Sequence, residues 1–157
     1  MSDGASDKPA VSDADLLARF RASTNQPRGS QTLDFQIVAL NQAERWVEAS
    51  FAARPEFCNP MGQIQGGYLC AMLDDVMSVA GLVTSGMTHV MPTLEMKTSF
   101  LRPAMPGGRL RGIGRVLRWG KSIAFTEGEL LDAEGRLLAK ATATAMPAPF
   151  AKFKEKA

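Results

Sequence analysis

The chain has 157 residues, a net charge of +2, one histidine and two cysteines. This length suits one domain with a full apolar core, and so small a charge, without basic residues set among aromatics, argues against a nucleic-acid partner. One histidine leaves no ready zinc site or histidine-based triad, and two cysteines, Cys58 and Cys70, are too few for a secreted disulfide framework.

The N-terminal part, 1–30, predicts a polar segment with one short helix. Residues 1–10 are rich in Ser, Gly and Asp, which favours disorder, and they contain no apolar core typical of a signal peptide. Ser12 predicts a helix N-cap, and Pro, Gly and Asn in 23–31 predict a loop. No stretch approaches the roughly 20 apolar residues of a membrane span, so we expect a soluble, cytoplasmic protein.

Residues 31–147 predict one α+β domain, and 148–157 predict a flexible tail. Alternating apolar residues indicate strands at 32–39 and 45–53, and the longest apolar helical pattern lies within 59–85. Four further strands are predicted at 90–101, 109–118, 122–131 and 136–146. Short turns join them, which antiparallel strands accept and parallel strands do not. This order predicts one antiparallel sheet wrapped around one buried helix.

The central helix has two contrasting faces. The bulky face, which should pack on the sheet, consists of Leu69, Leu73, Val76, Ala80 and Val83. The other face is a stripe of small residues that holds one carboxylate: Gly67, Cys70, Ala71, Asp74, Ser78 and Gly81. An aspartate among small apolar residues needs a partner, so Asp74 is a candidate catalytic residue, although a solvated position is the alternative. Asp75 lies about 100° further round the helix and is expected to be a solvated bystander.

Gly66 and Gly67 lie at the start of this helix, where backbone N–H groups have no intrahelical acceptor. An amide there can hold a developing oxyanion, with help from the positive end of the helix dipole. A Gly-Gly pair is also an ordinary feature of tight turns, so the pair is weak evidence by itself.

With these parts in place, residues 33–146 resemble the hot-dog-fold acyl-CoA thioesterases, specifically the phenylacetate-pathway (PaaI-like) group. The family pattern has an Asn, a Gly, a His-Gly-Gly and an acidic residue nine positions after the His. Here these positions read Asn59, Gly62, Gln65-Gly66-Gly67 and Asp74. The family's long strand begins with a Thr or Ser near the site, and that position is Thr93 here.

The resemblance implies a hot-dog domain that forms a homodimer, or a homotetramer of such dimers, with active sites at the dimer interface. It implies hydrolysis of an aryl- or medium/long-chain acyl-CoA to the free acid and coenzyme A, with no cofactor and no metal. Asp74 would be the nucleophile or general base, and the Gly66 amide of the partner subunit would bind the oxyanion. Asn59 would orient the water or the carboxylate, and Thr93 would hydrogen-bond to one of them.

Gln65 stands where the family has its histidine. A Gln amide can donate and accept hydrogen bonds but is not protonated near neutral pH, so it can orient a group or support the oxyanion. This departure motivates an alternative, a non-catalytic hot-dog protein that binds acyl-CoA or a similar ligand. Hydration of an enoyl-CoA ranks last, because it needs an Asp/His pair and His89 is badly placed and expected to be structural.

Basic residues supply candidate contacts for coenzyme A. We expect Arg102, Arg118 and Lys121 to flank one region, with Gly67 also in the binding site; Lys121 lies in a Gly-Lys-Ser turn that resembles a family segment near the coenzyme. Three more arginines alternate on one strand and fit either phosphate binding or a solvated sheet edge: Arg109, Arg111 and Arg115. Four methionines fit either an adaptable acyl pocket or, more commonly, core packing: Met72, Met77, Met91 and Met96.

Overall fold

The computed structural model describes residues 11–151. The expected disorder of residues 1–10 and the end of the predicted tail lie outside the described part. Its helices and strands, in chain order, are α1 (Asp13–Ala22), α2 (Arg28–Thr32), β1 (Gln36–Asn41), β2 (Trp46–Ala52), a 3-10 turn η1 (Pro55–Phe57), α3 (Gly66–Thr84), β3 (His89–Val90), β4 (Thr93–Phe100), β5 (Arg109–Trp119), β6 (Ala124–Leu131), β7 (Leu137–Ala145) and β8 (Ala148–Pro149).

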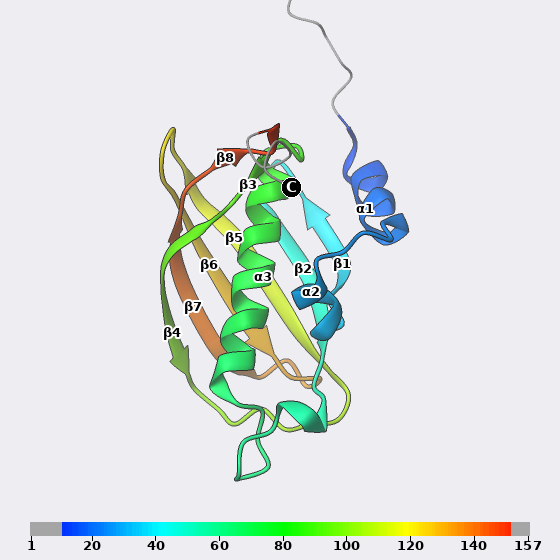
Figure 1. Cartoon of the computed structure of the whole chain (residues 1–157), viewed down its shortest axis with the longest axis vertical. Helices are drawn as coiled ribbons and strands as arrows, with labels where there is room; N and C mark the ends of the chain where they lie inside the picture. Colours follow the sequence, from blue (N-terminus) through cyan, green and yellow to red (C-terminus); the bar gives the residue numbers. More distant parts are fainter. Residues whose placement is uncertain (1–10, 152–157) are drawn as a thin grey trace, which may run out of the picture.

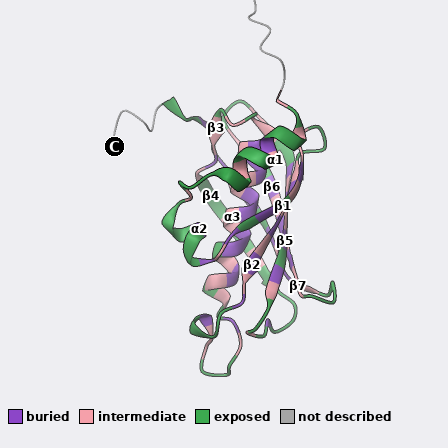
Figure 2. Ribbon diagram, turned by 90° about the vertical axis from the view of Figure 1, so that its right-hand side faces the viewer, coloured by how far each residue is buried: buried purple, intermediate pink, exposed green. Residues whose placement is uncertain are grey.

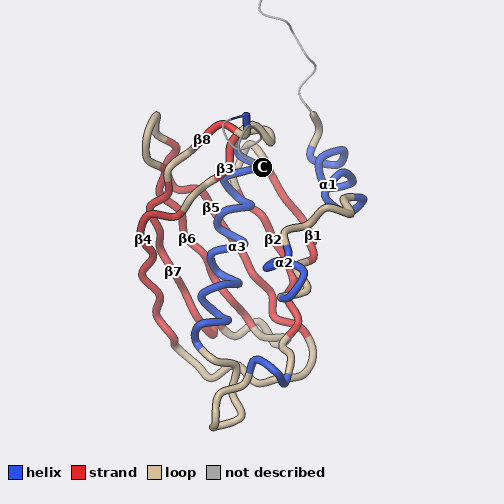
Figure 3. Tube along the Cα trace, in the orientation of Figure 1, coloured by secondary structure: helices blue, strands red, loops and turns tan. Residues whose placement is uncertain are grey.

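Six strands form one antiparallel sheet in the order β1-β2-β5-β6-β7-β4, which curves around α3 (Figure 1). The strands β1 and β4 are its two edges, while β3 and β8 form a small separate pair. The helices α1 and α2 lie on the β1 side, away from β4 (Figure 3). The predicted α+β architecture, one antiparallel sheet around one long helix, is confirmed.

The bulky face of α3 makes the core. All five residues predicted to face the sheet are buried: Leu69, Leu73, Val76, Ala80 and Val83. They pack with the inward residues of β2, where Val47, Ala49 and Phe51 are fully shielded from solvent. Figure 2 shows this buried stripe on α3, whereas α1 and α2 are mostly exposed. Among the described segments, α3 is long and apolar enough to cross a membrane, although the sequence analysis expected no such stretch. Because its bulky face is buried against the sheet, α3 is the core helix of the domain.

Glycine in the sheet lets α3 approach closely. A Cβ atom at Gly114 of β5 would overlap the backbone carbonyl of Val76, and one at Gly128 of β6 would press on Met77. No flexible side chain separates Gly114 from the helix backbone, so neither side can yield easily. The helix is therefore held at a fixed height and rotation above β5.

Four local predictions were wrong. The predicted loop 23–31 contains the start of α2, because Pro27 sets an extended N-cap and the turn gains a tertiary partner described below. The predicted strand 90–101 breaks at Pro92, and its first part, β3, pairs with β8 instead of joining the main sheet. This pairing also orders Ala148, which was expected in the flexible tail. The predicted first strand begins at Gln36, four residues later than expected.

The replacement Gly114→Ala should destabilise the protein by about 3 kcal/mol, because the new methyl group meets helix backbone that cannot move aside. Urea unfolding of the purified protein measures this change. Gly29→Ala is the matched control, since a Cβ at Gly29 has nothing within 4 Å and the position is helical. Equal stability of both variants would contradict close contact between α3 and β5.

Candidate active site

Asp74 is half-buried on the small-residue stripe of α3 and has one clear partner. The Thr93 hydroxyl donates a hydrogen bond to Asp74 Oδ1 at 2.6 Å. Thr93 is the first residue of the edge strand β4, and the register of β4 against β7 shifts directly after it. Such an irregularity re-aims a side chain, and here Thr93 reaches the helix. The structure thus joins two of the residues predicted for the site.

The stripe is open where Asp74 lies and closed further along. Gly67 and Ala71 are exposed, and Cys70, Asp74 and Ser78 are half-buried. Gly81 is buried, since Met91 packs directly against it. The small residues thus leave space beside Asp74 but not at the end of the helix.

The N–H group of Gly66 is available for a ligand. Gly66 is the first residue of α3, and the hydrogen bonds of the described residues give this N–H no acceptor. The preceding turn is held in place by the Gln65 N–H, which donates to the Phe57 carbonyl at 2.8 Å, and by stacking of the Phe57 and Tyr68 rings. The ring of Phe100 covers Gly66 so closely that a Cβ there would lie 2.9 Å from its Cζ.

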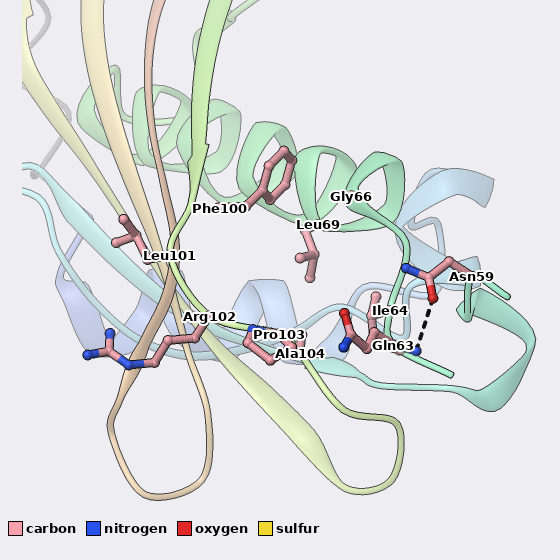
Figure 4. Close-up of a pocket in the computed structure, with 10 residues that line it drawn as sticks. All are labelled: Asn59, Gln63, Ile64, Gly66, Leu69, Phe100, Leu101, Arg102, Pro103 and Ala104. Carbon is pink, nitrogen blue, oxygen red and sulfur yellow. Dashed lines mark hydrogen bonds between the residues drawn. The ribbon is translucent and has the colours of Figure 1, made fainter. Parts of the chain in front are cut away.

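Asn59 holds the loop that leads to α3. Its Oδ1 accepts the backbone N–H groups of Met61 at 2.9 Å and Gln63 at 3.2 Å. Because both donors occupy the oxygen, the side-chain NH₂ group is what Asn59 can offer to a ligand. Figure 4 shows this nitrogen on the side of Asn59 that faces Gly66.

A cleft of about 400 Å³ joins these groups, and we call it the Gly66 cleft. Its lining includes Asn59, Gly66, Phe100 and Arg102, so it contains three of the residues predicted for the site (Figure 4). Asp74 is not part of this lining. Gly66 and Asp74 are eight positions apart, which is about 12 Å along the axis of a helix. One subunit therefore does not bring the carboxylate and the free amide together.

Gln65 and Gly67 lie at the same end of α3. Gln65 is the N-cap residue, its side chain is exposed and it makes no capping hydrogen bond. Gly67 is exposed in the first turn, and a Cβ atom added there would have no other atom within 4 Å. Both positions are accessible to a ligand that reaches the Gly66 amide.

Asp75 is not the solvated bystander that the sequence predicted. Ser30 of α2 is buried and donates a hydrogen bond to Asp75 Oδ1 at 3.0 Å, while the buried Oδ2 has no partner among the described residues. Burial raises the pKa of Asp75, and the neighbouring charge of Asp74 raises it further, against the effect of the Ser30 hydrogen bond. The Ser30 hydrogen bond to Asp75 thus connects α2 to α3.

The basic residues expected around coenzyme A do not form one group in the subunit. Arg102 follows β4 at the end of the molecule where α3 begins, and its Nη1 donates to the Leu137 carbonyl at 2.8 Å. Arg118 and Lys121 lie at the opposite end, beside Trp119, whose ring meets His89 just after α3 (Figure 1). Within one subunit Arg102 therefore lies apart from Arg118 and Lys121, and their expected part in binding coenzyme A stays a prediction.

The remaining candidate arginines are ion-paired on the sheet. Arg109 binds Asp34, Arg111 binds Glu48, and Arg115 lies near Glu127 and Glu129. These pairs favour the alternative of a charged sheet surface over phosphate binding. Of the methionines, Met72, Met77 and Met91 are buried, which favours core packing over an acyl pocket. The imidazole of His89 contacts Thr88 and Trp119, as expected for a structural residue.

Two residues near the site were not found from the sequence. Ser30 lies 45 residues before its partner Asp75, and nothing in the sequence links them. Phe100 ends β4 at an exposed position, and only the fold brings its ring onto Gly66. Both are tertiary contacts without a local signal.

Comparison with known proteins identifies the family. The family model of the thioesterase superfamily matches residues 61–139, which include α3, β4, β5 and β6. The chain belongs to the thioesterase superfamily. This thioesterase superfamily member has the hot-dog fold and is a thioester hydrolase, as the resemblance implied.

Individual proteins that are similar to this thioesterase superfamily member are consistent with the family assignment. A protein of Saccharolobus solfataricus, an esterase by name, is 34% identical over 110 residues, 69% of this chain and 75% of its own. Human acyl-coenzyme A thioesterase 13 is 28% identical over 107 residues, 67% of this chain and 75% of its own. The crystal structure of a phenylacetic acid degradation-related protein of Ralstonia eutropha JMP134 matches with a TM-score of 0.76 and 39% identity, over 83% of this chain and 98% of that one.

The raised pKa of Asp75 has a consequence for stability. Because the pKa of Asp75 is raised in the folded state, its ionisation is less favourable in the folded protein than in the unfolded chain. The free energy of unfolding therefore falls as the pH rises through the raised pKa, and this loss is absent at low pH, where the group is protonated in both states. Asp75→Asn should therefore raise the melting temperature at pH 7 by about 2–4 °C, the equivalent of roughly 1 kcal/mol in a chain of this size. The gain should disappear as the pH falls toward 4, as measured by thermal unfolding at each pH.

Asp74→Asn provides the matched control, since it removes the same charge one residue earlier on the open face. Little change in melting temperature is expected, because the Asn oxygen can still accept the Thr93 hydrogen bond. If both variants gained equally at pH 7, removal of negative charge from α3 would explain the result and the burial argument would fail.

Proposed function

We propose that the protein hydrolyses an acyl-CoA to the free acid and coenzyme A, with Asp74 as general base or nucleophile. The observation that carries the proposal is the hydrogen bond from Thr93 to Asp74 Oδ1 on an open, small-residue helix face. The human relative named acyl-coenzyme A thioesterase 13 supports coenzyme A as the carrier.

Each residue has a defined part in the proposed reaction. Thr93 occupies Asp74 Oδ1, which leaves Oδ2 to take a proton from an attacking water or to attack the carbonyl itself. The N–H group of Gly66, at the positive end of α3, stabilises the oxyanion that forms, and the side-chain NH₂ of Asn59, which lines the same cleft, supports it. Collapse of the tetrahedral intermediate then breaks the C–S bond and expels the thiolate of coenzyme A, a good leaving group. Where water attacks, this step gives the free acid; where Asp74 attacks, it leaves an acyl–Asp74 anhydride that a water then hydrolyses. The reaction needs no metal and no cofactor.

The oxyanion donor would come from a second copy of the chain. The edge strand β4 has no partner on its outer side among the described residues, and its side chains Leu94 and Phe100 are 56% and 54% exposed. An exposed, unblocked edge readily pairs with another strand, and a twofold axis would make the two strands antiparallel. Cys70 lies midway between Gly66 and Asp74 on α3, and its Sγ lies 3.5 Å from Thr98 Oγ1 in β4.

A twofold axis that passes near Cys70 and the middle of β4 would bring the Asp74 end of this α3 segment in one subunit beside the Gly66 end of the same segment in the other. It would place the partner subunit's Gly66 opposite Asp74, and it would bring the end of the molecule that carries Arg102 toward the partner's Lys121. The separated groups of one subunit thus become neighbours in a homodimer. Two free cysteines suit the reducing cytoplasm, where we propose that this dimer acts.

One feature favours the alternative of a non-catalytic acyl-CoA binder. Gln65 is exposed beside the Gly66 amide and replaces the histidine of the resembled family. Its amide can contact the thioester but cannot transfer a proton near neutral pH. On the proposed mechanism no acid is required there, because the thiolate leaves without protonation.

Asp74→Ala should reduce kcat by about 10³-fold, within the range for loss of a general base, with acyl-CoA binding retained. Thr93→Val should reduce kcat about tenfold, since the carboxylate remains but loses the hydrogen bond that orients it. Release of free thiol from phenylacetyl-CoA and octanoyl-CoA measures both. Equal, background-level rates for wild type and Asp74→Ala would support the non-catalytic alternative.

The Gly66 amide can be removed without disturbing the helix. Proline is well tolerated at the first helical position, and Gln65 has the extended conformation (φ −63°, ψ 139°) that precedes proline. Because a Cβ would meet Phe100, the pair to compare is Gly66→Pro and Gly66→Ala, both in a Phe100→Ala background. The proline variant should have a kcat about 10²-fold lower than the alanine variant, which retains the N–H group.

Mixing subunits tests which chain provides that amide. Alone, neither Asp74→Ala nor the Gly66→Pro/Phe100→Ala protein should retain more than about 1% of the activity of its parent. After unfolding and refolding together, one of the two sites in each mixed dimer would have both groups intact. That site takes its Gly66 and Phe100 from the Asp74→Ala chain, so roughly a quarter of the wild-type activity should return. No recovery, in a mixture shown by mass spectrometry to contain mixed dimers, would mean that both groups act within one chain.

A further inference from the structure

A second cavity, of about 380 Å³, lies between α3 and the N-terminal helices. We call α1, α2 and the loop between them the N-terminal cap, and this space the cap cavity. Its size falls within the range of about 300–1,000 Å³ that is usual for small-molecule sites. Neither the Gly66 cleft nor the proposed reaction accounts for it.

The lining of the cap cavity is mainly apolar. Leu16 and Phe20 of α1 form one wall, and Phe35, just before β1, forms another. Val79 and Leu82 of α3 form the floor, and both are only partly buried. The one charged residue in the lining, Arg19, is exposed. Such a space fits a hydrocarbon group better than a nucleotide or a sugar.

The cap cavity and Asp74 both border the same partly exposed face of α3. Positions four apart on a helix form a continuous ridge, and Asp74, Ser78 and Leu82 lie on one such ridge. Leu82 lines the cavity about 12 Å from Asp74 along the helix axis, and the small Ser78 lies between them. The cavity wall also includes Ser30, whose hydroxyl binds Asp75, the residue next to Asp74.

The two sides of Asp74 therefore differ in chemistry. Toward β4 lies the proposed interface, with the partner's Gly66 cleft and its polar and basic residues. Toward the cap lies the apolar floor of Val79 and Leu82. A thioester bound at Asp74 has a polar carrier and an apolar acyl group, which match these two directions.

We propose that the cap cavity binds the acyl group of the substrate, and that this group is an extended, medium-length alkyl chain. A phenylacetyl ring attached near the carbonyl would lie over Ser78 and stop short of Leu82. A linear chain can follow the ridge and enter the cavity. This inference rests on the proposed function, because it takes Asp74 as the position of the thioester carbonyl.

Filling the cavity tests the proposal. In wild type, kcat/KM should increase from acetyl-CoA to decanoyl-CoA, by about fourfold for each methylene group that enters the cavity. Leu82→Trp should reduce the ratio of decanoyl-CoA to acetyl-CoA kcat/KM at least about tenfold. Leu117→Trp, an equal change at an exposed position on the outer face of the sheet, should leave this ratio unchanged. Ser78→Phe, which blocks the ridge without touching the cap, should act like Leu82→Trp.

A binding measurement separates this inference from the reaction itself. Calorimetry on Asp74→Asn should show tighter binding of decanoyl-CoA than of acetyl-CoA, and Leu82→Trp in that background should abolish the difference. This result would support the acyl site even if wild type hydrolysed no acyl-CoA. Equal binding of both thioesters, or an unchanged chain-length ratio in folded Leu82→Trp and Ser78→Phe, would overturn the inference even if wild type proved to be an active thioesterase.

Discussion

The close contact between α3 and the glycine positions of the sheet determines much of this structure. Because Gly114 admits the backbone of Val76, the helix lies deep in the curve of the sheet and cannot rotate about its axis. Its bulky face is then buried completely, and its small face is turned toward the space between β4 and the N-terminal cap. The position of every polar group on α3 follows from this one packing constraint.

The constraint gives two adjacent carboxylates opposite environments. Asp74 faces the edge strand, where a single hydroxyl binds one oxygen and leaves the other free. Asp75 faces the cap, where Ser30 binds one oxygen and burial isolates the other. A rotation of about 100° per residue is enough to separate a residue suited to chemistry from one that joins two parts of the fold. Between them, the two aspartates connect α3 to both of its flanks.

The parts of this molecule that were predictable from sequence are those with a local pattern. The period of the helix identified all five buried residues of the bulky face, and the family motif identified Asp74 and Thr93 as neighbours. Asp75 was misjudged because its partner is 45 residues away and carries no signal of its own. Arg102 and Lys121 were grouped because both flank the same strand in the sequence, but they flank its opposite ends and so lie at opposite ends of the molecule. Local pattern does not contain that information.

The fixed rise of α3 has a wider implication. A helix is a rigid rod, so no movement within one chain shortens the roughly 12 Å between Gly66 and Asp74. On the proposed chemistry, a folded monomer would be stable but inactive, so association of two subunits would be required for catalysis and not only for stability. In such a dimer the register of the β4 edge would matter as much as the carboxylate, since an altered strand register would misplace the Gly66 amide as surely as its deletion.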